Sequence, residues 1–381
     1  MINIFIIGSK GIPANYGGFE TFVDNLVRRK QRKDIQYFVS CMGSGEDFNY
    51  ENAHCFFVPL KKDTAFNRLI NVSNALTWVE KYLKAHTEEK TNIVYILGCR
   101  VGLLIKKHKK VLKKMGCKIM VNPDGLEWKR SKWNGIQKKI LLASEKRLIT
   151  NSDYIVCDSL GIKDYVSSTY KINKDNINYI AYGSDINESK STMDEACEWL
   201  NTFNTKPNEY YLIVGRFVPE NNYELIIKEF LKSKTTKKLL IISNYTKDNF
   251  YNSLQEKLNF ENDSRIVFVG TLYNEELLKK IRELAFCYIH GHSVGGTNPS
   301  LLEGLSYTKI NLLFDVSFNK EVGQNECIYF TSEQNDFVEK IDYIESSYTS
   351  LIKKLHPKKN IEERYSWDLI VKQYEDLFNR L

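Results

Sequence analysis

The stretch His290–Glu303 combines two adjacent glycines, an Asn-Pro pair and a glutamate, and it directly follows the apolar run Ala285–Ile289. The run predicts a buried strand, while Asn298 and Pro299 predict the N-cap and the first residue of a helix. The N–H groups and the positive dipole end at such a helix start can hold an anion such as a diphosphate. Glu303, about one turn inside the helix, would accept two hydroxyls of a ribose.

Backbone groups near this helix start are the candidate anion ligands. Gly295 and Gly296 would let the chain approach a phosphate closely, and Thr297, Ser300 and Leu301 would donate their N–H groups. A tight turn followed by a capped helix explains the same residues without any ligand, and that alternative stays open.

A second glycine-rich loop, Gly8–Glu20, follows the apolar run Ile2–Ile7, which predicts a strand and not a signal peptide. Its glycines do not have the GxGxxG spacing, which disfavours a dehydrogenase. Gly17 and Gly18, at the start of the next predicted helix, would offer further N–H donors to a bulky ligand. An irregular surface loop is the alternative.

Two carboxylates follow the predicted strand Lys118–Val121, namely Asp124 and Glu127. The carboxyl ends of parallel strands form the ligand crevice of an open α/β sheet, so both residues are candidates for catalysis. An Asp-Gly turn beside a surface glutamate is the competing interpretation.

Basic and aromatic residues alternate in residues 128–147, and a second basic group occupies residues 106–114. Such a pattern is typical of contact with an anionic membrane surface, although a solvated helix face explains it equally well. The residues predicted for acceptor or membrane contact are Trp128, Lys129, Arg130, Lys132 and Trp133.

The composition is that of a globular protein: 381 residues, 43% hydrophobic and 27% charged, with a formal charge of +7. The positive excess favours phosphates, nucleic acid or anionic lipid without choosing among them. Eight scattered cysteines show no metal-ligand spacing and predict buried thiols in a reducing cytosol. No apolar run reaches the ~18 residues needed to span a bilayer.

Strand and helix patterns alternate along the chain and restart after a polar stretch, which predicts two α/β domains. We predict an N-terminal acceptor-binding domain over 1–186, a linker over 187–208 and a C-terminal nucleotide-sugar-binding domain over 209–358. Residues 359–381 predict a final helix that packs back on the N-terminal domain.

Four motifs in order carry a resemblance to a known family: Ile7–Thr21, Asn122–Arg130, Gly215–Asn222 and Gly295–Glu303. Together they resemble the GT-B glycosyltransferases of family 4. The first two are similar to the bacterial rhamnosyltransferase subgroup that builds capsule and rhamnose-rich cell-wall polysaccharides.

The resemblance implies two Rossmann-like domains that face each other across a cleft, and a retaining transfer. The donor it implies is dTDP-β-L-rhamnose, and the acceptor is a glucose or GlcNAc carried by undecaprenyl diphosphate. It further implies no cofactor, no metal ion and a cytoplasmic enzyme held peripherally at the inner face of the membrane.

By the same resemblance Arg216 contacts the donor diphosphate, and Asp124 stands where the wider family often has a catalytic histidine. Two departures concern the donor site: the chain has Asn221 or Asn222 in place of a lysine, and Gly295 in place of a glutamate. Donor-binding residues are then Gly17, Gly18, Arg216, Asn221, Asn222, Gly295, Gly296, Thr297, Asn298, Ser300, Leu301 and Glu303. The catalytic candidates are Asp124, Glu127 and Arg216.

Other functions fit parts of the sequence. A family 4 enzyme with a UDP-sugar donor and a non-catalytic sugar-nucleotide-binding subunit both stay open. A phosphorylase or epimerase would leave the basic face without a role. A nucleic-acid-binding protein would explain the charge but not the glycine motifs, so no nucleic acid is expected as a partner.

Overall fold

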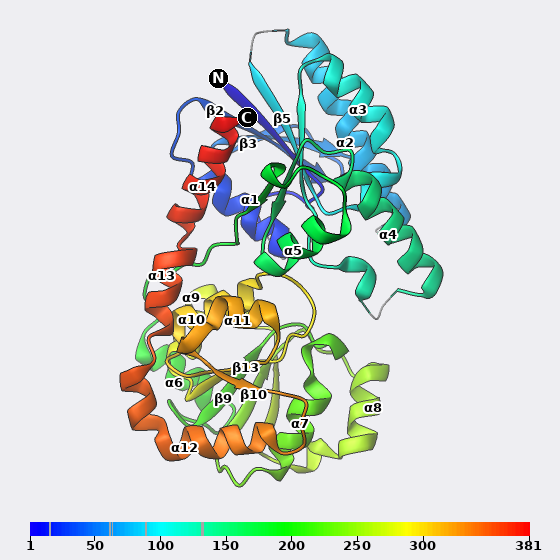
Figure 1. Cartoon of the computed structure of the whole chain (residues 1–381). Helices are drawn as coiled ribbons and strands as arrows, with labels where there is room; N and C mark the ends of the chain where they lie inside the picture. The colour runs from blue at the N-terminus through cyan, green and yellow to red at the C-terminus, as the bar shows by residue number, and fades with distance from the viewer. Residues whose placement is uncertain (15–16, 61, 63, 88–89, 131–132) are drawn as a thin grey trace. The chain divides into compact units, whose positions relative to one another are not determined.

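The computed structural model describes residues 1–14, 17–60, 62, 64–87, 90–130 and 133–381, which form two compact units (Figure 1). The first unit comprises Met1–Gly183 together with Trp367–Leu381, and the second comprises Ser184–Ser366. Each unit is built on one sheet of mainly parallel strands with helices on both faces, the doubly wound arrangement that alternating strands and helices predict.

The first unit has an eight-stranded sheet of order β3-β4-β2-β1-β5-β6-β7-β8, in which β3 pairs antiparallel with β4 and the other pairs are parallel. Its elements are β1 (Ile2–Ile7), α1 (Gly18–Arg28), β2 (Ile35–Met42), β3 (Phe48–Tyr50), β4 (Ala53–Val58), α2 (Ala65–Ala85), β5 (Thr91–Leu97), η1 (Arg100–Leu103), α3 (Ile105–Lys114), β6 (Lys118–Asn122), η2 (Glu127–Lys129), α4 (Gly135–Ile149), β7 (Tyr154–Cys157), α5 (Leu160–Thr169), η3 (Lys174–Asn176), β8 (Ile177–Tyr179) and α14 (Trp367–Arg380).

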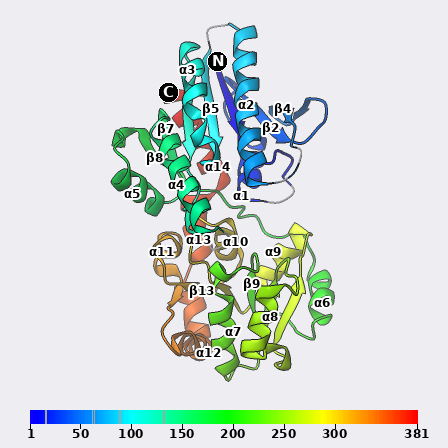
Figure 2. The same cartoon turned by 90° about the vertical axis from the view of Figure 1, so that its right-hand side faces the viewer.

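Helices cover both faces of this sheet (Figures 1 and 2). The helices α2, α3, α4 and α5 bury their apolar side chains against one face in a single core. On the other face α1 and α14 pack together through aromatic rings, with Phe22 of α1 4.9 Å from the ring of Tyr374 and Tyr37 of the sheet 6.5 Å from Phe378. His108 fastens α3 to α2, since its two ring nitrogens lie 2.9 Å from Ser73 Oγ and 2.8 Å from Glu80 Oε1.

The second unit has a six-stranded parallel sheet of order β11-β10-β9-β12-β13-β14. Its elements are α6 (Met193–Asn201), β9 (Tyr210–Val214), η4 (Pro219–Asn221), α7 (Tyr223–Lys232), β10 (Lys238–Ile242), α8 (Asn249–Leu258), η5 (Phe260–Asn262), β11 (Ile266–Gly270), α9 (Glu275–Glu283), β12 (Cys287–His290), α10 (Pro299–Tyr307), β13 (Asn311–Phe314), α11 (Ser317–Gly323), η6 (Gln324–Glu326), β14 (Ile328–Phe330), α12 (Asp336–Lys354) and α13 (Pro357–Tyr365). The helices α7, α8 and α12 pack on one face, and α6 and α9 pack on the other.

Residues 187–208, which we predicted as a linker, belong instead to the second unit. They contain α6, whose start is fixed by a capping box between Thr192 and Glu195. Ala196 and Leu200 are fully buried in the core between α6, α9 and the sheet. The polar residues around α6 suggested a linker, but two apolar side chains four residues apart are enough to dock one face of a short helix.

Residues 359–381, predicted as one helix, form parts of two. The helical structure is interrupted at Ser366, which lies between α13 of the second unit and α14 of the first. Trp367 begins α14 and lies against Gly183, where a side chain would come within 2.4 Å of the indole ring. Among the described residues, no helix is long and apolar enough to cross a bilayer.

Candidate functional site

The carboxyl ends of β9 and β12 meet where the second sheet reverses its strand order. From β9 the chain adds β10 and β11 on one side, then crosses over to add β12, β13 and β14 on the other. Open α/β sheets bind ligands in the crevice outside such a switch point. The loop that carries Arg216 follows β9, and the stretch 290–303 follows β12, so the two motifs of the second unit meet there.

Hydrogen bonds tie these two loops together. Ser293, in the loop after β12, donates from its backbone N–H and its hydroxyl to the carbonyl oxygen of Glu220, at 2.9 and 2.8 Å. Asn222 Nδ2 donates to the Gly291 carbonyl at 2.8 Å. Gly291 has no room for a side chain, because a Cβ would lie 2.3 Å from the carbonyl oxygen of Asn221. The loops therefore form one rigid platform at the switch point.

The two asparagines of this platform act on the protein itself. Asn221 is buried, and its Nδ2 donates to the carbonyl oxygen of Arg216 at 2.7 Å. Asn222 has a left-handed backbone with φ of 56°, a conformation that asparagine tolerates better than most residues. We predicted both as donor-binding residues, but their amides shape the loop and leave the exposed Arg216 as its cation.

The start of α10 is capped from within. Asn298 is the N-cap, as predicted, and its Oδ1 accepts the N–H of Ser300 at 2.9 Å, while its carbonyl oxygen accepts the N–H of Leu301 at 3.0 Å. Two of the three N–H groups expected to hold an anion are thus already hydrogen-bonded. Thr297 is buried, and a side chain at Gly295 would meet nothing within 4 Å, so the space before the helix is open. Gly296 lies half-buried between them.

Glu303, predicted to bind a ribose, is positioned by a buried arginine. Its Oε2 lies 2.5 Å from Nη2 of Arg282, whose side chain is only 3% exposed, whereas the carboxylate side chain is 41% exposed. A charge-assisted pair of this kind fixes the rotamer of the carboxylate while leaving part of it at the surface.

In the first unit the switch point lies between β1 and β5. Gly8 has φ of 103°, and a Cβ there would lie 2.4 Å from the Leu97 carbonyl oxygen, so only glycine allows the two strand ends to come this close. Glu20 fills the start of α1, where its Oε1 accepts the Lys10 N–H at 2.6 Å and its Oε2 would lie 2.0 Å from a Cβ at Gly17. The helix start at Gly17 and Gly18, predicted to donate to a ligand, has no side-chain cap among the described residues, and the nearby Glu20 carboxylate binds Lys10 instead.

Asp124 follows β6, the strand beside β5, in a left-handed turn with φ of 64°. Its N–H donates to Asn122 Oδ1 and its Oδ1 accepts the Gly125 N–H, both at 2.8 Å. Burial raises the pKa of Asp124, and Glu127 adds to the rise, while Arg130 opposes it. Its side chain is still 32% exposed, so the carboxyl is both shielded and accessible.

Arg130 brings the two predicted carboxylates together: its guanidinium lies 2.8 Å from Glu127 Oε2 and 3.8 Å from Asp124 Oδ2. Glu127 also accepts a hydrogen bond from Trp133 Nε1 at 3.2 Å and lies 3.9 Å from Arg100. The two guanidinium groups hold Glu127 in place, so it organises the turn. Of the two carboxylates, Asp124 is the one suited to take a proton.

The indole nitrogens of the two tryptophans face protein carboxylates, while both residues stay partly exposed, and their membrane contact remains a prediction. The indole nitrogen of Trp128 is buried near the Glu145 carboxyl of α4, and that of Trp133 donates to Glu127. Lys129 lies over the Trp128 ring at 5.5 Å. Lys132, from the same predicted surface, lies outside the described residues.

Exposed apolar side chains lie at the first turns of α2, α3 and α4, three helices that cover one face of the first unit's sheet. They are Phe66 and Ile70 of α2, Leu104 before α3, and Ile136 and Ile140 of α4, which we call the apolar edge. Each of these helix starts follows a strand's carboxyl end in the chain, and α2 and α4 both pack on η1. The apolar edge therefore lies on the same side of the sheet as Asp124.

Sequence reasoning missed two polar residues at this edge. Asp158 directly follows β7 and is buried, and its negative charge, with that of Asp124, helps to raise the pKa of Tyr182 beyond the effect of burial. Arg100 follows β5 and reaches Glu127. Asp158 comes directly after an apolar strand run and Arg100 three residues after one, the same signal that singled out Asp124.

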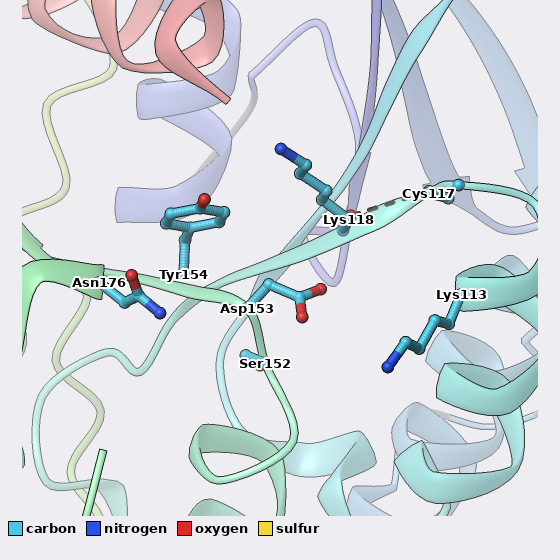
Figure 3. Close-up of a pocket in the computed structure, with 8 residues that line it drawn as sticks. Lys113, Cys117, Lys118, Ser152, Asp153, Tyr154 and Asn176 are labelled. Atoms are coloured by element: carbon cyan, nitrogen blue, oxygen red, sulfur yellow. Dashed lines mark hydrogen bonds between the residues drawn. The ribbon is translucent and has the colours of Figure 1, made fainter. Parts of the chain in front are cut away.

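A hollow of about 390 Å³ lies at the opposite edge of the first sheet (Figure 3). It is lined by Lys118 and Tyr154, which begin β6 and β7, and by Lys113, Asp153 and Asn176. The amino ends of the strands, not the carboxyl ends, surround it, so it is separate from the candidate site.

Comparisons with known proteins bear on the fold. A family model described as "Domain of unknown function (DUF1972)" matches residues 1–185, slightly less than half of the chain. No curated protein matches the sequence. The structure is similar along its full length to Anabaena HepE in complex with UDP, with a TM-score of 0.74, 11% identity and 100% of both chains covered.

Sucrose-phosphate synthase from Thermosynechococcus elongatus is similar with a TM-score of 0.77 and 12% identity, covering 100% of this chain and 98% of that one. A glycosyltransferase from Rickettsia africae ESF-5 gives 0.73 and 15%, with the same coverage. The chain has the GT-B fold. The two units are the two Rossmann-like domains of this fold. In each of them the candidate residues lie at the carboxyl edge of the sheet.

The GT-B platform of the second domain can be tested at Asn222. Replacement by alanine removes the hydrogen bond to Gly291 and puts alanine in the left-handed backbone conformation, which it tolerates less well than asparagine. We therefore expect the unfolding free energy to fall by about 1–3 kcal/mol. Asn222→Gly keeps the backbone conformation and should lose less. Urea unfolding of the three proteins measures both losses, and an alanine variant as stable as the wild type would return Asn222 to the list of ligand-binding candidates.

Proposed function

We propose that this protein is a retaining glycosyltransferase that moves L-rhamnose from dTDP-β-L-rhamnose to a glucose or GlcNAc of an undecaprenyl-diphosphate-linked acceptor. The reaction would serve the synthesis of a bacterial surface polysaccharide. Support comes from the GT-B fold, the resemblance of four sequence motifs to the rhamnosyltransferase subgroup, and the geometry of the two sheet edges.

The observation that carries the proposal is the rigid platform at the switch point of the second unit. It presents the exposed guanidinium of Arg216 from a loop held by Asn221, Asn222 and Ser293. A diphosphate leaving group is weakly basic, so the enzyme has to stabilise its negative charge more than to protonate it. Arg216 would do this, with Glu303 holding the ribose beside α10, and the proposal includes neither a metal ion nor a cofactor.

Asp124 is the proposed catalytic carboxylate of the first unit. Its raised pKa and partial exposure suit a group that accepts the acceptor hydroxyl proton or balances positive charge on the departing sugar. Glu127 and Arg130 hold the turn in which Asp124 lies. Retention of configuration is taken from the resemblance.

The competing donor is a UDP-sugar. HepE was crystallised with UDP and with UDP-glucose, which shows what that GT-B protein binds. Our proposal of dTDP-β-L-rhamnose rests on the sequence motifs. A panel of nucleotide-sugar donors distinguishes it from a UDP-sugar. A non-catalytic sugar-nucleotide-binding subunit is the alternative that turnover excludes.

A lipid-linked acceptor has to reach Asp124 from a membrane, and the apolar edge is the surface we propose for that approach. Phe66 and Ile136 are 70% and 73% exposed there. The neighbouring α3 adds exposed lysines, among them Lys106, Lys107 and Lys110. Apolar side chains bordered by lysines match an interfacial contact with anionic lipid, which would place the protein peripherally at the inner face of the cell membrane.

The donor is tested first. With a glucosyl- or GlcNAc-diphospholipid acceptor, dTDP-β-L-rhamnose should give product and UDP-glucose should not, and Arg216→Gln should lower kcat/KM at least tenfold through loss of a charge-assisted contact worth ~1.5–3 kcal/mol. Lys228→Gln, an exposed cation on α7, is the matched control and should behave as the wild type. Turnover with UDP-glucose alone would favour the alternative donor, and nucleotide binding without any turnover would favour the binding subunit.

Asp124→Asn separates catalysis from turn formation. Asparagine adopts the left-handed conformation and still accepts the Gly125 N–H, so the fold and donor affinity should persist while kcat falls by ~10²–10⁴. In the wild type, the acid limb of the pH–rate profile should lie above that of an ordinary aspartate, because burial raises the pKa of Asp124. Asp175→Asn on the surface is the control, and retained turnover in Asp124→Asn would remove this residue from the mechanism.

Membrane contact is measured by sedimentation with vesicles. The protein should bind vesicles that contain anionic phospholipid and be released by salt, because each lysine near such a surface contributes about 1 kcal/mol that salt screens. Phe66→Ser with Ile136→Ser should weaken binding, whereas Tyr273→Ser, an aromatic residue 84% exposed in the second unit, should not. Equal binding to neutral and anionic vesicles would contradict the proposed attraction between the lysines and anionic lipid.

A further inference from the structure

Two histidines of the second unit stack on each other at the switch point. His290 ends β12 and is 1% exposed, whereas His292 lies in the loop after it and is partly exposed. Their ring centroids are 4.1 Å apart and the planes are inclined by 7°. The buried ring thus sets the orientation of the outer ring.

The backbone of His292 is fixed as well. Its carbonyl oxygen accepts Asn319 Nδ2 at 3.1 Å, and the next residue, Ser293, is held by two hydrogen bonds to Glu220. A side chain whose ring and backbone are both held can meet a ligand without losing rotamer freedom, which is the property of a preorganised binding group.

The imidazole edge of His292 lies beside Arg216. A Cβ at Gly215, the residue between β9 and Arg216, would lie 3.3 Å from Cε1 and 3.9 Å from Nε2 of His292. The outer histidine therefore reaches from the end of β12 across to the end of β9, the place where the crevice of an open sheet takes its ligand.

The electrostatic setting keeps this ring neutral. Burial, with a further contribution from the positive charge of Arg216, lowers the pKa of His292 to about 3. A neutral imidazole has one nitrogen that donates a hydrogen bond and one that accepts. Diphosphate oxygens can only accept, so a cation serves them better, whereas a sugar hydroxyl both donates and accepts and matches the neutral ring.

The buried His290 is linked to the start of α10. Its Nδ1 lies 3.2 Å from the Tyr288 hydroxyl, which is 3.0 Å from Ser300 Oγ. Its Nε2 is buried and has no hydrogen-bond partner among the described residues. A buried polar atom left in this state costs stability, so its presence needs an explanation, and a role in the site is one of those known.

We propose that His292, supported by His290, hydrogen-bonds a hydroxyl of the transferred sugar and helps to select it. This inference rests on the proposed function, since it assigns a residue to the same donor site. It also accounts for Gly295, which carries no side chain and faces open space at the position where the resembled family has a glutamate. In our proposal the imidazole of His292, three residues earlier, makes the sugar contact that a glutamate would make at that position.

The test compares the nucleotide with the nucleotide sugar. Calorimetric titration of dTDP and of dTDP-β-L-rhamnose into wild type, His292→Ala, His292→Gln and His292→Asn reports each affinity. We expect dTDP affinity to stay within about threefold in all variants, while His292→Ala lowers the affinity for dTDP-β-L-rhamnose and kcat/KM at least tenfold. The amide of glutamine or asparagine can replace one ring nitrogen, so one of these two variants should recover part of the loss.

Matched controls separate the outcomes. His356→Gln, an exposed histidine of the same unit, should change neither affinity. Equal losses for dTDP and dTDP-β-L-rhamnose, or no loss at all, would overturn the inference. If His292→Ala does not fold, the two titrations of His292→Gln and His292→Asn decide in the same way, and thermal unfolding checks that these variants are folded. A wild-type protein that binds neither compound would instead overturn the proposed function.

Discussion

The site depends on how the loops at the carboxyl edges of two parallel sheets satisfy their own polar groups. A loop at such an edge has backbone N–H and C=O groups without strand partners, and each needs another partner or water. In the second unit the loops after β9 and β12 supply partners for one another through Ser293, Glu220, Asn222 and Gly291. The position of Arg216 is a consequence of that mutual bonding, because its own carbonyl is one of the acceptors.

The same constraint changes what the helix starts can do. The first turn of α10 is capped by the Asn298 side chain, whereas α1 has no side-chain cap among the described residues and its Glu20 carboxylate binds the Lys10 N–H of the preceding loop. A bare helix start attracts any anion, whereas a capped one leaves recognition to side chains nearby. The amides of Asn221 and Asn222 are accordingly parts of the scaffold, and in the proposed function the diphosphate is left to the exposed Arg216.

The fold and the general place of the site follow from local sequence, but the partners of individual residues do not. Apolar runs followed by glycine or aspartate predict the strands and mark Asp124 and Arg216 at their ends. Asn298 is predictable as a cap because its partner is two residues away. The indole nitrogen of Trp128 faces Glu145, and Glu303 pairs with Arg282, and neither partner lies within a helical turn. Spacing along the chain carries no information on such contacts.

After Ser366 the chain leaves the second unit and returns to the first, and this has a consequence for folding during translation. The first unit's sheet presents Tyr37 and Tyr95 on the face that α14 covers, and Tyr374 and Phe378 of α14 are made only after the whole second unit. While the ribosome is translating residues 184–366, that aromatic face has α1 but lacks its second helix. Transiently exposed apolar surface of this kind makes a folding intermediate prone to aggregation. The first unit therefore completes its core only after α14 has been made, although most of its sequence comes first.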